Sequence, residues 1–136
     1  MPIFSNDTVV LSRRDASNSN LGSTFGGTRL YGTTADTSNV TQLTSRTTGV
    51  TINAPVGTLT LFSTANSATA STFTVTNSFV EAGDVVMVTQ RSGTDPRSIF
   101  VTATAAGSFA VTSASISGTT TEAPVYNFVV IKGTII

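Results

Sequence analysis

The chain contains no cysteine, no histidine and no tryptophan among its 136 residues. Without cysteine, it has neither a disulfide nor a thiolate nucleophile. Without histidine and cysteine, it lacks the Ser-His and Cys-His nucleophile pairs and the usual protein ligands of zinc and iron. These absences exclude the commonest hydrolytic mechanisms and transition-metal sites.

Charge is also scarce. Seven basic and seven acidic residues cancel, and charged residues make up 10% of the chain, against about 25% in ordinary soluble domains. A neutral chain has no basic surface with which to neutralise nucleic-acid phosphates or to attract anionic lipids. We therefore expect no nucleic acid and no membrane as a partner.

The beginning of the chain does not look like a secretion signal. The stretch MPIFSNDTVVLSRRD has no basic segment followed by an apolar run, which is the pattern of a signal peptide. We therefore expect the chain to be synthesised in the cytoplasm.

Hydroxyl residues dominate what is present, with 27 threonines and 17 serines. Because threonine is β-branched, it favours a pleated, half-buried strand over a helix. Eleven glycines and four prolines interrupt the chain at intervals typical of turns. This composition predicts an all-β protein.

The first 40 residues differ from the rest, and we assign residues 1–40 to an extended polar N-terminal arm and residues 41–136 to one β-sandwich domain. The arm is rich in Asn, Ser, Gly and Thr, and its apolar residues follow no sustained period. Such a segment buries little apolar surface by itself. It is either a flexible leader or an arm that becomes ordered on a partner, and its several large apolar residues favour the second reading.

Strand patterns recur about every ten residues after residue 48. They cover residues 49–53, 57–62, 72–76, 84–91, 97–105, 107–115 and 125–132, with a hairpin turn at Ala106-Gly107. Alternation directs Leu59, Leu61, Phe73 and Val75 to one face of their strands. The spacing predicts an antiparallel β-sandwich or barrel, with a jelly roll as one form of it.

The last strand is apolar on both faces, since Tyr126, Phe128 and Val130 alternate with Val125, Val129 and Ile131. A two-layer sandwich covers only one face of each sheet, so the other face needs a further partner. The chain also ends on two isoleucines. We therefore expect a homo-oligomer with an interface at Tyr126, Phe128, Val130, Ile135 and Ile136.

Charged side chains offer little for catalysis. The carboxylates, Asp7, Asp15, Asp36, Glu81, Asp84, Asp95 and Glu122, all fall in loops or at strand ends, where carboxylates are normally solvated. No spacing resembles a calcium or phosphate-binding loop. We predict no catalytic pair, no metal and no cofactor, and hence no enzyme. Arg46, Arg91 and Arg97 flank strand ends and are candidates for pairs between subunits.

Several blocks together resemble a family of small threonine-rich proteins of tailed bacteriophages. They are TQLTSRTTGVTINAPVGTLTLFS, FTVTNS, DVVMVTQRSGTD, VTATAAGSFAVT and EAPVYNFVVIKG, which span about residues 40–133. Each block alone is a common β pattern, and the order and spacing carry the resemblance.

The resemblance implies a structural virion protein, of the capsid cement or head decoration type, made in the cytoplasm of the host bacterium and located on the capsid surface. Its implied partners are copies of itself, assembled as a homotrimer, and the major capsid protein. Capsid-anchoring residues are then expected in the arm, at Phe4, Arg13, Arg14, Leu21, Phe25, Arg29 and Tyr31. The alternative is a tail-fibre tip or adhesin that binds a host receptor or glycan, with Tyr31, Phe79 and Tyr126 as its aromatic candidates.

Overall fold

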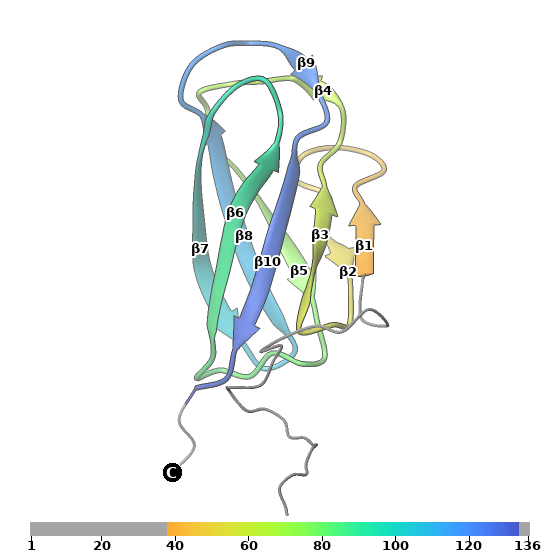
Figure 1. The fold of residues 1–136 in the computed structure, drawn as a ribbon, viewed down its shortest axis with the longest axis vertical. Coiled ribbons are helices and arrows are strands. Elements are labelled where there is room, and N and C mark those ends of the chain that lie inside the picture. The colour runs from red at the N-terminus through yellow and green to blue at the C-terminus, as the bar shows by residue number, and fades with distance from the viewer. Residues whose placement is uncertain (1–37, 134–136) are drawn as a thin grey trace, which may run out of the picture. The chain divides into compact units, whose positions relative to one another are not determined.

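The computed structural model describes residues 38–133, which form a sandwich of two four-stranded sheets (Figure 1). One sheet has the strand order β1-β3-β10-β6, the other has the order β2-β5-β8-β7, and the pair β4-β9 lies at one end. The strands are β1 (Ser38–Thr41), β2 (Val50–Thr51), β3 (Val56–Thr60), β4 (Thr64–Ala65), β5 (Ser71–Thr76), β6 (Val85–Ser92), β7 (Arg97–Ala105), β8 (Ser108–Ser115), β9 (Thr121–Glu122) and β10 (Val125–Ile131). The predicted all-β sandwich is confirmed.

Two strand pairs differ from the antiparallel expectation. β1 runs parallel to β3, and β2 runs parallel to β5, while the remaining pairs are antiparallel. Both sheets are therefore mixed, which departs from the antiparallel jelly roll. Parallel partners need a long connection, and the residues between β1 and β3 supply it by passing through β2 in the opposite sheet.

The core lies between the two sheets and follows the alternation expected from the sequence. Leu59, Leu61, Phe73 and Val75 are all buried, as predicted. Phe109 of β8 and Phe128 of β10 meet across the layers with ring centroids 5.5 Å apart. Burying one such side chain stabilises the fold by roughly 1.5–3 kcal/mol, so the facing strands hold the two sheets together.

Turns join the strands where the sequence predicts them. β7 and β8 form a hairpin closed by Gly107, whose φ of 84° lies in the left-handed region that favours glycine. β6 and β7 are joined by the turn that contains Pro96, and this turn connects the two sheets. The short strands β4 and β9 were not predicted from the sequence.

Candidate functional site

Buried polar side chains gather at the end of the sandwich that carries β4 and β9, at the top of Figure 1. They come from segments far apart in the sequence. The group that we call the polar cluster consists of Arg46, Asn66, Asp95, Arg97, Ser113, Glu122 and Tyr126. Because buried polar groups are costly when they lack partners, the hydrogen bonds of this cluster decide whether it stabilises the fold.

Arg46 joins the loop after β1 to the strands β4 and β9. Its Nη1 donates to Asn66 Oδ1 at 3.1 Å, and its Nη2 donates to the carbonyls of Thr64 at 3.0 Å and Glu122 at 2.7 Å. Its Nε donates to the carbonyl of Phe62. Burial lowers the pKa of Arg46 most, and the nearby charge of Arg97 lowers the pKa further. An arginine starts from so high a pKa that it stays charged at neutral pH.

Arg97 joins the two sheets at the beginning of β7. Its Nε donates to the hydroxyl of Tyr126 on β10 at 2.6 Å, and its Nη2 lies 3.4 Å from Ser113 Oγ on β8. The Tyr126 hydroxyl in turn donates to Ser113 Oγ at 2.9 Å. The guanidinium, the phenol and the serine hydroxyl therefore form one hydrogen-bonded triangle that spans the core.

Asn66 separates the positive side of the polar cluster from the negative side. Its Oδ1 accepts from Arg46 and also from Arg97 Nη1, at 2.8 Å, while its Nδ2 donates to Asp95 Oδ2 at 2.9 Å and Glu122 Oε1 at 2.6 Å. Within residues 38–133, ion pairs form only at Lys132, so the arginines and carboxylates of the cluster meet through this amide. The neutral amide of Asn66 therefore hydrogen-bonds to both guanidinium groups and to both carboxylates.

The two carboxylates organise the loops around them. Asp95 accepts from the backbone N–H of Thr120 at 2.8 Å and from its hydroxyl at 2.9 Å. Glu122 accepts from the backbone N–H groups of Thr94 and Asp95. The bond from Asn66 lowers the pKa of Asp95 most, and the bond from Thr94 lowers the pKa of Glu122 most, each against an opposing effect of burial. Both carboxylates stay ionised at neutral pH, so neither suits the role of general acid.

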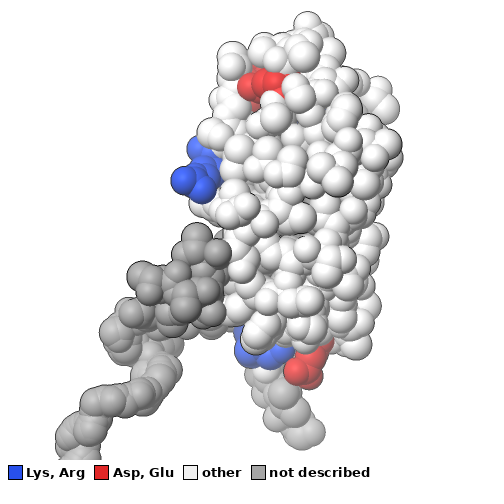
Figure 2. Space-filling view, turned by 90° about the vertical axis from the view of Figure 1, so that its right-hand side faces the viewer, with Lys and Arg blue, Asp and Glu red and all other residues white. Residues whose placement is uncertain are grey.

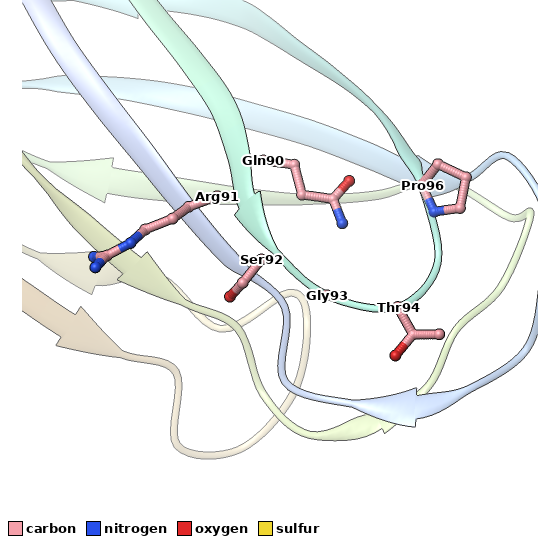
Figure 3. A pocket seen from close by; sticks show the side chains of 6 residues that line it. All are labelled: Gln90, Arg91, Ser92, Gly93, Thr94 and Pro96. Carbon is pink, nitrogen blue, oxygen red and sulfur yellow. The ribbon is translucent and has the colours of Figure 1, made fainter.

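An open pocket of about 340 Å³ lies beside the cluster, in the β6–β7 turn (Figure 3). Its lining residues are Gln90, Arg91, Ser92, Gly93, Thr94 and Pro96. Gln90 fixes the turn, because its Oε1 accepts from the backbone N–H of Arg97 at 3.0 Å and its Nε2 donates to the carbonyl of Asp95 at 3.0 Å. The pocket offers hydroxyl groups and one guanidinium, which suit hydrogen bonding to a polar group of a partner.

The pairing of β6 with β10 is irregular at Arg91. Tyr126 pairs with Gln90 and Val125 pairs with Ser92, so the register between β10 and β6 passes over Arg91. Alternation along β6 leaves Arg91 exposed, as it does Thr89. Figure 3 shows Arg91 and Gln90 extending to opposite sides of β6. Arg91 is exposed, while Gln90 points into the turn.

A second group of charges lies at the other end of β6. Lys132 Nζ lies 2.7 Å from Asp84 Oδ2 and 3.3 Å from Glu81 Oε2, and the backbone N–H of Gly133 donates to Asp84 Oδ1 at 2.9 Å. Burial opposes ionisation of Asp84, but the bonds from Lys132 and from the backbone of Gly133 and Glu81 lower its pKa. The bond to Asp84 raises the pKa of Lys132. These contacts fasten the end of β10 to the start of β6.

The expected interface residues on β10 need correction. Tyr126, Phe128 and Val130 are 0%, 2% and 1% exposed, because they face the opposite sheet of the same subunit. Their burial also removes Tyr126 as an aromatic platform for a glycan, whereas Phe79 is 48% exposed. The interface residues Ile135 and Ile136 lie outside the described residues, as do the anchoring residues Phe4, Arg13, Arg14, Leu21, Phe25, Arg29 and Tyr31.

Sequence reasoning missed the polar cluster. It placed Arg46 and Arg97 in pairs between subunits and placed Asp95 among solvated carboxylates, yet all three are buried within one subunit. Their partners come from positions up to 76 residues away. No local spacing carries such information, and the closeness of Asp95 and Arg97 on either side of Pro96 is the only hint in the sequence.

Across residues 38–133, no group of three or more acidic residues is arranged to hold a metal ion, and no helix is long and apolar enough to cross a membrane. Comparison of the whole chain with protein-family models, with curated proteins and with solved structures gave no match.

Proposed function

We propose that this protein is a structural component of a tailed-bacteriophage virion that binds the outer capsid surface as a cement or decoration protein. The proposal makes it a non-enzymatic homo-oligomer on the capsid surface whose second partner is the major capsid protein. The family resemblance of residues 40–133 motivates the proposal, and the distribution of charge in the structure supports it.

The observation that carries the proposal is the scarcity of exposed charged side chains. Arg46, Asp84, Asp95 and Arg97 are buried in internal contacts. Figure 2 shows a face on which charged residues appear only at isolated places. A surface of uncharged threonine and apolar side chains loses little solvation energy when another protein covers it. Such a surface suits a subunit that is packed against others, with many copies acting together through multivalency.

Copy number tests this proposal. Gel densitometry of purified virions is expected to give hundreds of copies of the chain per particle, because a decoration protein covers the repeating shell. A count of a dozen or fewer contradicts the shell role and favours the tail.

The predicted anchoring arm needs a separate test. A variant that lacks residues 1–37 keeps β1, which begins at Ser38. If the arm is the anchor, this variant loses most of its binding to empty heads in a sedimentation assay while its circular dichroism spectrum stays that of a β protein. Full occupancy by the truncated chain removes the arm from the proposal.

The second candidate is a tail-fibre tip or adhesin, and the polar pocket around Arg91 and Thr94 favours it. Sugar sites combine a concave surface with convergent hydrogen-bonding groups. Here Arg91→Ala is expected to abolish binding of virions to host cells while leaving the capsid intact. A normal rate of adsorption with this variant removes the candidate.

A further inference from the structure

The outer face of the sheet β2-β5-β8-β7 carries no charged side chain. Arg97 is the one charged residue in these four strands, and it is buried and bonded to Tyr126 of the opposite sheet. Because Phe73, Phe109 and Val111 point into the core, alternation turns the residues between them outward. Those outward residues are threonine, serine and alanine, with a single large side chain among them.

The large side chain is that of Phe100 on β7, which is 62% exposed. Phe100 pairs with Thr112 on β8, and Thr112 pairs with Thr72 on β5. Directly paired residues of neighbouring strands point to the same face, so an aromatic ring and two hydroxyl groups lie in line across three strands. With about 4.8 Å between neighbouring strands, this line is about 10 Å long.

A bulge in β7 adds a third hydroxyl group beside Phe100. The register between β7 and β8 shifts between Val101 and Ala103, and the hydroxyl of the intervening Thr102 lies 3.1 Å from that of Thr112. The Thr112 hydroxyl also lies 2.7 Å from the Thr72 hydroxyl. We call these three threonines the hydroxyl row. Their two mutual hydrogen bonds use two of the three hydroxyl protons, so one donor and most of the lone pairs stay available at the surface.

We infer that Phe100 and the hydroxyl row bind a neutral glycan that lies across the strands. A sugar ring has an apolar face of C–H groups, which stacks on an aromatic ring, and hydroxyl groups, which both donate and accept hydrogen bonds. The outer face of this sheet offers the matching groups side by side. Because the face carries no cation, an acidic glycan would lose solvation there without gaining an ion pair. A length of about 10 Å exceeds one sugar ring, so the ligand is an oligosaccharide or a polysaccharide.

The composition of this face favours a glycan over a protein partner. Serine and alanine are depleted in protein–protein interfaces, and serine and threonine are under-represented among the residues that dominate their binding energy. One exposed ring among such residues also lacks the cluster of large anchors that is typical of a protein interface. Met87, which is 53% exposed on the other sheet, is more typical of protein contacts. The inference concerns the isolated chain and does not depend on binding to a capsid.

Affinity electrophoresis of the full chain tests for the ligand. Native gels are cast with hydroxyethyl cellulose, dextran, starch or galactomannan, all of which are neutral, and with alginate, which is anionic. At least one neutral polymer is expected to retard the wild-type chain, whereas alginate is not. The inference is overturned if none of the neutral polymers retards the chain, or if alginate retards it as strongly as they do.

Substitutions on the two sheets test the position of the site. Phe100→Ala is expected to raise the dissociation constant for the retarding polymer about tenfold, while Met87→Ala, which truncates a similarly exposed side chain on the other sheet, leaves it unchanged. Equal effects of the two substitutions overturn the inference.

The hydroxyl row has a test of its own. Thr112→Val removes the central hydroxyl group and is expected to weaken binding severalfold, whereas Thr89→Val on the exposed face of β6 is expected to have no effect. Thermal unfolding of each variant checks that the sandwich stays folded. Full affinity in Thr112→Val overturns the assignment of the ligand to the row.

Fluorescence offers a direct readout because the native chain contains no tryptophan. Phe100→Trp keeps an aromatic ring at the site, so this variant is expected to retain binding, and an oligosaccharide of the retarding polymer is expected to change its emission. Met87→Trp is expected to show no change on the same addition. A change for Met87→Trp without a change for Phe100→Trp assigns the ligand to the other sheet and overturns the inference.

Discussion

The guanidinium groups of Arg46 and Arg97 share one acceptor, the side-chain oxygen of Asn66, at 3.1 and 2.8 Å. Two like charges this close would repel each other strongly in a dry interior. They are tolerated because the amide nitrogen of Asn66 faces the carboxylates of Asp95 and Glu122. The amide lets two cations and two anions balance without a direct ion pair.

Removal of this amide is expected to destabilise the fold. Asn66→Ala leaves both arginines and both carboxylates without their common partner, and breaking a buried charged network typically costs about 3–5 kcal/mol. Urea unfolding followed by circular dichroism measures the loss. The control is Asn127→Ala on the exposed face of β10, which is expected to change stability by no more than about 0.5 kcal/mol. Similar losses for both variants contradict the central role of Asn66.

Tyr126→Phe isolates the triangle that joins the two sheets. The substitution keeps the buried ring and removes only the hydroxyl, which accepts from Arg97 at 2.6 Å and donates to Ser113 at 2.9 Å. A hydrogen bond to a charged group contributes roughly 1.5–3 kcal/mol, so a loss of that size is expected in the free energy of unfolding. Unchanged stability would mean that water or Ser113 replaces the hydroxyl without cost to Arg97.

Gly118→Ala probes the packing of Asp95 against the β8–β9 loop. Gly118 has a φ of 91°, and a Cβ there would overlap the Asp95 carboxylate. The matched control is Gly107→Ala, because Gly107 has a similar φ of 84° and an added Cβ meets no atom within 4 Å. Backbone strain alone costs roughly 1–2 kcal/mol, so Gly118→Ala is expected to lower the unfolding free energy clearly more than Gly107→Ala does. Equal losses in thermal unfolding contradict a tight fit at Asp95.

Acid is expected to weaken the fold. The pKa values of Asp84, Asp95 and Glu122 all lie below their ordinary values of 3.8 for Asp and 4.5 for Glu. The unfolded chain therefore takes up protons first as the pH falls. The stability that these carboxylates contribute is complete above about pH 5 and is lost progressively as the pH falls below 4.5 and through their lowered pKa values.

A pH series of urea unfolding curves checks this dependence, and Asp84→Asn serves as the comparison. This variant has already lost one of the three contributing carboxylates, so its stability is expected to fall less steeply between pH 5 and pH 3. A slope identical to that of the wild type would assign the acid sensitivity to other groups.

Much of the fold could be predicted from local pattern. Alternation in residues 57–62 and 72–76 placed Leu59, Leu61, Phe73 and Val75 inside, and glycine marked the β7–β8 hairpin. Period-two alternation is a property of the strand itself, so the sequence carries it. Alternation does not say which of two apolar faces turns inward, and for β10 the face of Tyr126 was assigned to the wrong side.

What the sequence by itself determined is an all-β chain of threonine-rich strands with few charges and no thiol or imidazole chemistry. Only the tertiary structure decided where the charges went, because Arg46, Asn66, Asp95 and Glu122 meet through sheet pairing and loop packing over long separations. The tertiary structure also decided which face of β10 is buried, because the opposite sheet covers the face of Tyr126, Phe128 and Val130. Strand propensity is local, whereas the partners that satisfy a buried charge are brought together by the fold.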